Sequence, residues 1–110
     1  MSEVTQRRAA FAEWLARQHL GFDSRLTEVV YLPAGAPEDQ VRLLEVNTGL
    51  FPDPEEPIVP IEMSPAVSDL PFRVSVVDVT PDEWKRIQSN PGLLPAGWGL
   101  EGRHTIRRAR

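Results

Sequence analysis

Six of the eleven prolines in this chain fall between Gly49 and Pro71, and no other feature limits its possible folds as strongly. Proline has no backbone N–H to donate and its ring fixes φ, so this segment is excluded from a helix and from the interior of a sheet. The helices and the central strands must therefore come from the residues before and after it. Both sets should share one core, because 110 residues is a common size for a single domain.

The N-terminal part has the pattern of one helix followed by two strands. Apolar residues recur at helical spacing over residues 3–19, after Ser2 as N-cap and before Gly21, which suits a left-handed helix stop. Residues 26–32 and 41–46 are rich in β-branched side chains and are separated by a connection with glycine and proline. Antiparallel pairing of these two strands is the simplest outcome.

The C-terminal part predicts one strand and one short helix. Residues 72–79 (FRVSVVDV) have the β-branched composition of a strand that becomes buried on both faces toward its end. Residues 80–83 (TPDE) then combine an N-cap threonine, a proline at the first helical position and a glutamate at the third, which is a capping box. The helix should bury Trp84 and Ile87 and end near Ser89.

Together these elements indicate an α+β fold: a small antiparallel sheet of three to four strands with an N-terminal helix and a second short helix, in the order α-β-β-(β)-β-α. Both helices are expected on one face of the sheet. The optional strand is residues 58–63, as a short edge strand, and residues 93–100 should pack on the core through Trp98. Residues 1–102 form the single domain, and residues 103–110 a basic C-terminal tail, either frayed or a final short strand.

Composition excludes several classes of protein. The chain has no cysteine, so it has no disulfide and no thiolate chemistry. No stretch approaches the roughly 20 apolar residues of a membrane-spanning helix. The first 21 residues carry arginines and glutamates without a continuous apolar run, so they do not resemble a secretory signal. We expect a cytoplasmic protein that does not engage a membrane.

Catalytic and cofactor motifs are weak. Residues 97–102 (GWGLEG) match GxGxxG, but only eight residues follow, too few for the helix and strand of a dinucleotide-binding unit. The only histidines, His19 and His104, are far apart in sequence and lack the spacing of a metal site. No serine lies in a GxSxG elbow. The sequence therefore favours no metal, no cofactor and no enzymatic activity, with a small enzyme of unrecognised site as the third alternative.

Nucleic-acid binding is the second alternative, because the C-terminal segment is basic. Four arginines there could contact phosphates weakly and in a salt-sensitive way. These candidate contacts are Arg103, Arg107, Arg108 and Arg110. The net charge of −4 and the acidic middle of the chain oppose this alternative, since they would repel a phosphate backbone.

The leading hypothesis is a non-catalytic protein-interaction module, which means an adaptor, inhibitor or accessory subunit that binds another protein. The proline-rich segment offers apolar side chains and carboxylates that the core does not require. The predicted partner-binding residues are Leu50, Phe51, Asp53, Glu55, Glu56, Ile58 and Val59. A partner should then carry a complementary basic rim.

Overall fold

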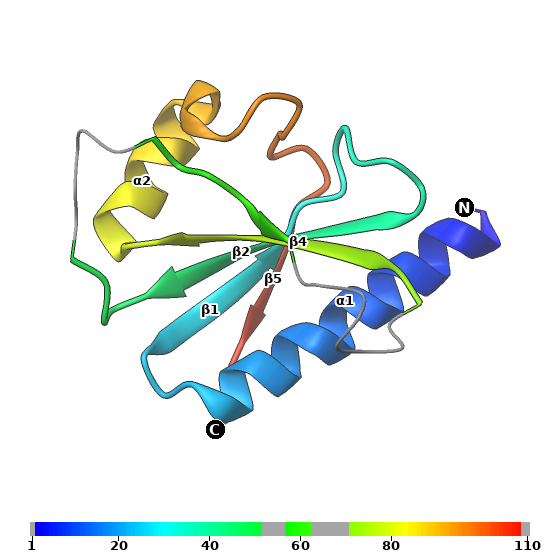
Figure 1. Ribbon diagram of the computed structural model, residues 1–110, viewed down its shortest axis with the longest axis horizontal. Coiled ribbons are helices and arrows are strands. Elements are labelled where there is room, and N and C mark those ends of the chain that lie inside the picture. The colour runs from blue at the N-terminus through cyan, green and yellow to red at the C-terminus, as the bar shows by residue number, and fades with distance from the viewer. Residues whose placement is uncertain (1, 52–56, 63–70, 109–110) are drawn as a thin grey trace.

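The computed structural model describes residues 2–51, 57–62 and 71–108, and it shows one α+β domain (Figure 1). Its elements are α1 (Glu3–Phe22), β1 (Leu26–Tyr31), β2 (Gln40–Asn47), β3 (Ile61–Glu62), β4 (Arg73–Val79), α2 (Pro81–Ser89), the 3₁₀ turn η2 (Pro91–Leu93) and β5 (His104–Arg107). In the described ranges, none of the helices has the length and apolar character needed to cross a bilayer.

The sheet is mixed and has five strands, in the order β3-β4-β2-β1-β5. β1 pairs antiparallel with β2, as the sequence predicts, and β3 lies at one edge. The prediction of an antiparallel sheet with three to four strands is wrong, because β2 and β4 run parallel and β5 adds a fifth strand. Residues 48–72 connect β2 to β4. This connection is long enough for β4 to begin at the same end of the sheet as β2, which parallel pairing requires.

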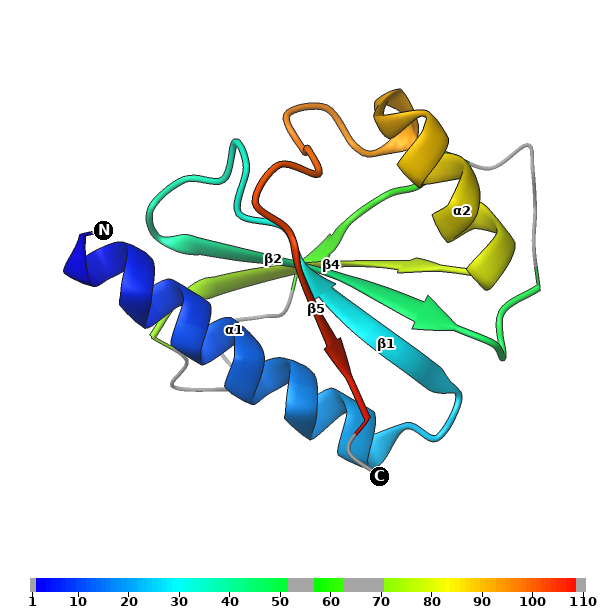
Figure 2. The same cartoon turned by 180° about the vertical axis from the view of Figure 1, so that it is seen from behind.

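The two helices cover opposite faces of the sheet, so the expectation of both on one face is also wrong (Figures 1 and 2). Neighbouring residues of each central strand point to different cores: Val29 packs with α1, whereas Val30 packs with α2. Leu43 and Leu44 of β2 divide in the same way. A strand with apolar residues on both faces needs cover on both faces, and this explains the three layers.

Helix α1 packs on the sheet mainly through small residues. Ala12 and Ala16 are fully buried, and Leu15 and Leu20 flank them. The tryptophan of this helix, Trp14, is half-exposed and stacks on Phe11 rather than entering the core. The predicted stop at Gly21 is wrong as well, because the helix continues to Phe22 and its C-cap is Asp23, with φ of −119°.

Helix α2 starts where the capping motif predicts. The Thr80 hydroxyl accepts a hydrogen bond from the Glu83 N–H at 3.1 Å, and the Glu83 carboxylate accepts one from the Thr80 N–H at 2.9 Å. Trp84 and Ile87 are buried against the second face of the sheet, and the helix ends at Ser89. Trp98 packs against the same core, with the Arg42 guanidinium 5.0 Å from its ring centre. The capping box, the two buried residues and the packed tryptophan are therefore confirmed.

The C-terminal segment is part of the sheet. β5 pairs antiparallel with β1, so that Ile106 lies opposite Val29 and is only 2% exposed. Of the two outcomes considered for residues 103–110, a frayed tail or a final short strand, the described residues show the strand, at His104–Arg107. Its one buried residue, Ile106, joins the core under α1.

The capping box gives a direct test of helix α2. Replacing Thr80 by alanine should lower the free energy of unfolding by about 1 kcal/mol, because the Glu83 N–H loses its acceptor. Denaturant unfolding measures the change through the transition midpoint. Ser89→Ala in the same helix serves as control, since its hydroxyl only contacts the Lys85 carbonyl at the surface. An unchanged midpoint for Thr80→Ala would show that this box does not hold the helix start.

The last strand gives a second test. Deletion of residues 103–110 should abolish cooperative unfolding, because it removes β5 and leaves Val29 uncovered. The point variant Ile106→Ala should cost about 2–5 kcal/mol, as expected for a large-to-small change in a core. Arg103→Ala is the matched control, because this side chain is exposed. A truncated chain that unfolds with the parent's midpoint would mean that the four-stranded remainder suffices.

Candidate functional site

A pair of carboxylates lies at the end of the two parallel strands. Leu43 of β2 and Val76 of β4 face α1, and two residues further along each strand the same face carries Glu45 and Asp78. The parallel register places Glu45 directly beside Asp78. Two acids that lie far apart in the sequence are thereby neighbours at the edge of the core.

His19 reaches this pair from the last turn of α1. Its Nδ1 contacts the Glu45 carboxylate, and both side chains are largely buried. The hydrogen bond to Glu45 raises the pKa of His19 above its usual value, and this effect outweighs burial, which acts in the opposite direction. His19 is therefore more than a cation at a helix C-terminus: it forms an ion pair with a buried strand residue.

Among the described carboxyl groups, that of Asp78 has the pKa that departs most from its ordinary value. Partial burial, a hydrogen bond with Glu45 and the negative charge of Glu45 together raise the pKa of Asp78 to about 7. Asp78 is therefore partly protonated around neutral pH. Perturbed titratable groups that line a hollow are typical of functional sites.

These side chains line a hollow of about 290 Å³, which we call the carboxylate hollow. Its lining combines titratable and apolar side chains. Phe22, at the end of α1, is 89% exposed, and Ile61 of β3 is 63% exposed. The described lining residues are His19, Phe22, Asp23, Leu26, Glu45, Ile61, Val76 and Asp78.

A larger depression of about 600 Å³, the apolar groove, shares the lining residues Ile61 and Asp78 with the carboxylate hollow. Among the described residues, its lining comprises Leu50, Phe51, Pro57, Ile58, Val59, Ile61, Asp78 and Glu83. Phe51 is 97% exposed and Val59 is 63% exposed, whereas Ile58 packs partly on the core below α2. Of the residues predicted to bind a partner, the structure brings Leu50, Phe51, Ile58 and Val59 together in this groove.

The three predicted acidic contacts, Asp53, Glu55 and Glu56, lie outside the described residues. The groove nevertheless carries acids that the prediction did not include. Asp78 comes from the end of β4 and Glu83 from the first turn of α2. The negative charge expected of this surface is thus supplied by the sheet and the helix that border it.

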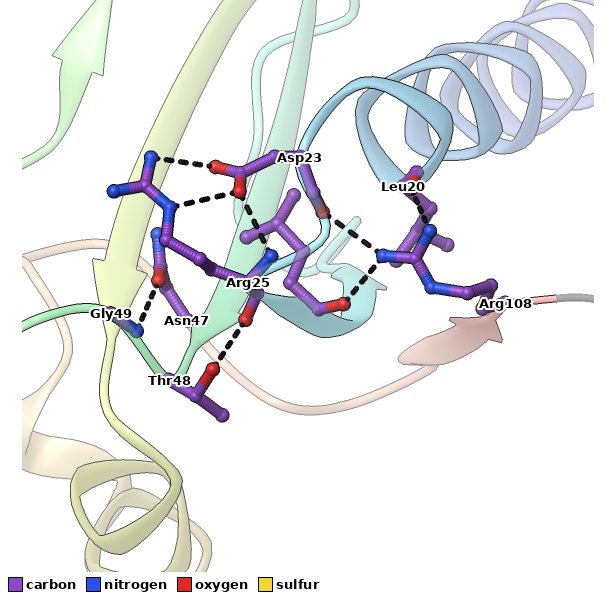
Figure 3. Close-up of polar contacts among 8 residues, drawn as sticks. Leu20, Asp23, Arg25, Asn47, Thr48, Gly49 and Arg108 are labelled. Carbon is purple, nitrogen blue, oxygen red and sulfur yellow. Dashed lines mark hydrogen bonds and ion pairs between the residues drawn. The ribbon is translucent and has the colours of Figure 1, made fainter.

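The C-terminal arginines are largely engaged within the fold. The guanidinium of Arg108 donates hydrogen bonds to the carbonyl oxygens of Leu20, Asp23 and Leu26, which closes the end of α1 (Figure 3). Arg107 pairs with Glu28 at 3.2 Å. Arg103 is exposed, and Arg110 lies outside the described residues. Two of the four candidate nucleic-acid contacts are therefore bound by the protein itself.

The turn between α1 and β1 is held by a second set of contacts (Figure 3). The Arg25 guanidinium donates to the Asp23 carboxylate at 3.0 and 3.2 Å, which lowers the pKa of Asp23. The Thr48 hydroxyl donates to the Arg25 carbonyl at 3.0 Å and ties this turn to the end of β2. These bonds fix the position of Phe22 at the rim of the carboxylate hollow.

The sequence motifs that suggest cofactors take other roles. Residues 97–102 form a turn before β5, in which Gly97 and Gly102 have φ of +83° and +69°, and no helix follows in the part of the chain described. The Gly97 carbonyl accepts a hydrogen bond from Arg42 at 2.8 Å. Within residues 2–51, 57–62 and 71–108, no three side chains of His, Asp or Glu are arranged to hold a metal ion.

Sequence reasoning missed Glu45 and Asp78 as a pair, and it treated His19 only as a partner of the helix dipole. The available signal was a single acid near the end of each of two apolar strands, VRLLEV and VSVVDV. Such acids are ordinary at a strand edge. They become a site only when the strands are known to be neighbours in parallel register.

The raised pKa of Asp78 predicts how stability depends on pH. The folded protein binds a proton between about pH 3.8 and 7 that the unfolded chain has released, so the free energy of unfolding falls as pH rises through this window. His19 acts with the same sign above pH 6.5, because its pKa is also raised. Asp78→Asn should flatten the dependence: parent and variant should melt alike near pH 4, and the variant should be the more stable near pH 8.

Chemical denaturation at several pH values measures this slope. Asp39→Asn is the matched control, because Asp39 pairs with Arg73 at the opposite end of β4 and its pKa is lowered, which gives the opposite sign. A parent protein that gains stability steadily from pH 4 to 8, with the same slope in the Asp78→Asn variant, would contradict the assignment.

Comparison with known protein families, with curated proteins and with solved structures finds no match for this chain. A function therefore has to be inferred from the chemistry of its own surface. The features available for that inference are the carboxylate hollow, the apolar groove and the ion pairs around them.

Proposed function

We propose that this protein is a non-catalytic interaction module that binds a segment of another protein in the apolar groove. The exposure of Phe51, Val59 and Ile61 in and beside one groove is the observation that carries the proposal. Large apolar side chains that gather in one exposed patch are typical of surfaces that become buried on binding.

The shape of the surface favours a protein over a small molecule. A small ligand is usually enclosed by its site. Phe51, in contrast, is almost fully exposed at the groove and would be buried only by a partner that extends over it. Aromatic side chains of this kind are the common anchors of protein interfaces.

The neighbouring backbone also suits a bound segment. Within the described residues, β3 pairs with β4 at two positions, Ile61 opposite Val76 and Glu62 opposite Ser75. Pro57 and Pro60 precede it and have no N–H to donate. The outer edge of β4 beside the groove is therefore bordered by chain that cannot extend the ladder, and an incoming extended segment could use it.

One observation supports binding of a protein over binding of a nucleic acid. Arg107 and Arg108 bind Glu28 and the end of α1, so they are less available for phosphates.

A pair of surface variants tests the proposal. Phe51→Ser combined with Val59→Ser should reduce capture of the cognate partner about tenfold or more, because loss of central apolar anchors typically costs about 2 kcal/mol or more. The melting curve should stay close to that of the parent, since both side chains are exposed. The measurement is quantitative affinity capture from the native host.

Leu93→Ser is the control, because Leu93 is also an exposed apolar residue but does not line the groove. The partner should be retained by the parent and by this control, and lost from the double variant. Equal capture by all three proteins would show that the groove does not bind the partner.

A further inference from the structure

The carboxylate hollow has an unbalanced charge. His19 is paired with Glu45, and Asp23 is paired with Arg25. Within the described residues, Asp78 has no cation at ion-pair distance. It is therefore the acid of this hollow whose charge the fold leaves without a direct partner.

Charged groups on several elements surround Asp78. Glu45 on β2 and Asp23 at the end of α1 disfavour its ionised form, and His19 on α1 favours it. Arg25 contributes only a distant charge, because its guanidinium is turned to Asp23. Glu83 of α2 lines the groove with Asp78 and is not among the described lining residues of the hollow. Among those described lining residues, the acids Asp23, Glu45 and Asp78 outnumber the one histidine.

We propose, as an extension of the proposed function and resting on it, that the carboxylate hollow receives a lysine or arginine side chain of the partner segment, with Asp78 as its counter-ion. The hollow and the apolar groove share the lining residues Ile61 and Asp78, so a segment bound in the groove would pass beside the hollow. Phe22, Leu26 and Val76 provide apolar walls for the methylene stem of such a side chain, while its charged end meets the acids.

Binding of a cation here is coupled to proton release. Free Asp78 is partly protonated at neutral pH, and a cation beside it favours the ionised form. Affinity should therefore rise with pH, by about tenfold between about pH 6 and 8, because the ionised fraction of a group that titrates near 7 rises by about that factor. His19 acts in the same direction when it loses its proton, since the hollow then becomes more negative.

The test uses a small probe and needs no identified partner. 4-Phenylbutylamine carries a lysine-like ammonium group and an apolar ring, and 4-phenylbutan-1-ol is its uncharged counterpart. The full chain is titrated with each compound and followed by NMR, through the backbone amides of residues 44–46 and 76–79 and the carboxyl carbon of Asp78. The amine should shift these signals in a saturable way and lower the titration midpoint of Asp78, whereas the alcohol should not.

Asp78→Asn should weaken amine binding about tenfold at pH 8 and leave only the pH dependence that His19 contributes, since an amide cannot supply the charge of Asp78. The Asp39→Asn variant should bind as the parent does, because Asp39 pairs with Arg73 at the far end of β4 from Asp78. Equal binding of the alcohol, unchanged binding by the Asp78→Asn variant, or an amine that leaves these signals unmoved would each overturn the cation site.

This outcome is separable from that of the proposed function. If the amine fails while partner capture still depends on Phe51, the groove binds a protein but the hollow does not take a cation. If the amine binds as expected while capture is insensitive to Phe51, the cation site stands and the groove assignment is wrong.

Discussion

The central strands have to be buried on both faces, and the rest of the structure depends on this constraint. β1, β2 and β4 each carry apolar residues at successive positions, so that Val30, Leu44 and Val77 form one core while Val29, Leu43 and Val76 form the other. A sheet of this kind is stable only between two layers. α1 covers one face and α2 with residues 94–100 covers the other, and the connection between β2 and β4 must be long enough for parallel pairing (Figures 1 and 2).

The same pairing places Glu45 beside Asp78, which is unfavourable by itself. Two adjacent carboxylates at the edge of a core repel each other and lose hydration. The fold relieves this by the ion pair of Glu45 with His19 and by the raised pKa of Asp78, which leaves that group partly protonated near neutral pH. Local conflicts of this type tend to occur where a protein binds or reacts with something else. The surrounding exposed apolar side chains, Phe22 and Phe51 above all, lie in the two hollows that share Asp78.

The C-terminal segment has a structural role that its charge conceals. Ile106 completes the core under α1, and Arg108 binds three carbonyl oxygens where α1 ends (Figure 3). The position of His19 and Phe22 at the carboxylate hollow therefore depends on a residue 88 positions after Leu20 in the chain. The basic composition of this segment suggests a phosphate-binding tail. In the structure, its Arg108 instead binds the C-terminal end of α1, the helix whose last turns carry His19 and Phe22.

The sequence by itself determined the local structure: the capping box that starts α2, the extents of β1, β2 and β4 to within a residue or two, and the edge position of β3, the one strand described in the proline-rich segment. It also indicated Leu50, Phe51, Ile58 and Val59 as surface residues, because proline keeps that segment apart from the strands. Only the tertiary structure decided the direction of β4, the opposite placement of the helices and the meeting of His19, Glu45 and Asp78. Capping and strand propensity depend on interactions between residues a few positions apart, so the local sequence specifies them. Strand order and register depend on how the side chains fill both cores at once, and no local pattern specifies that.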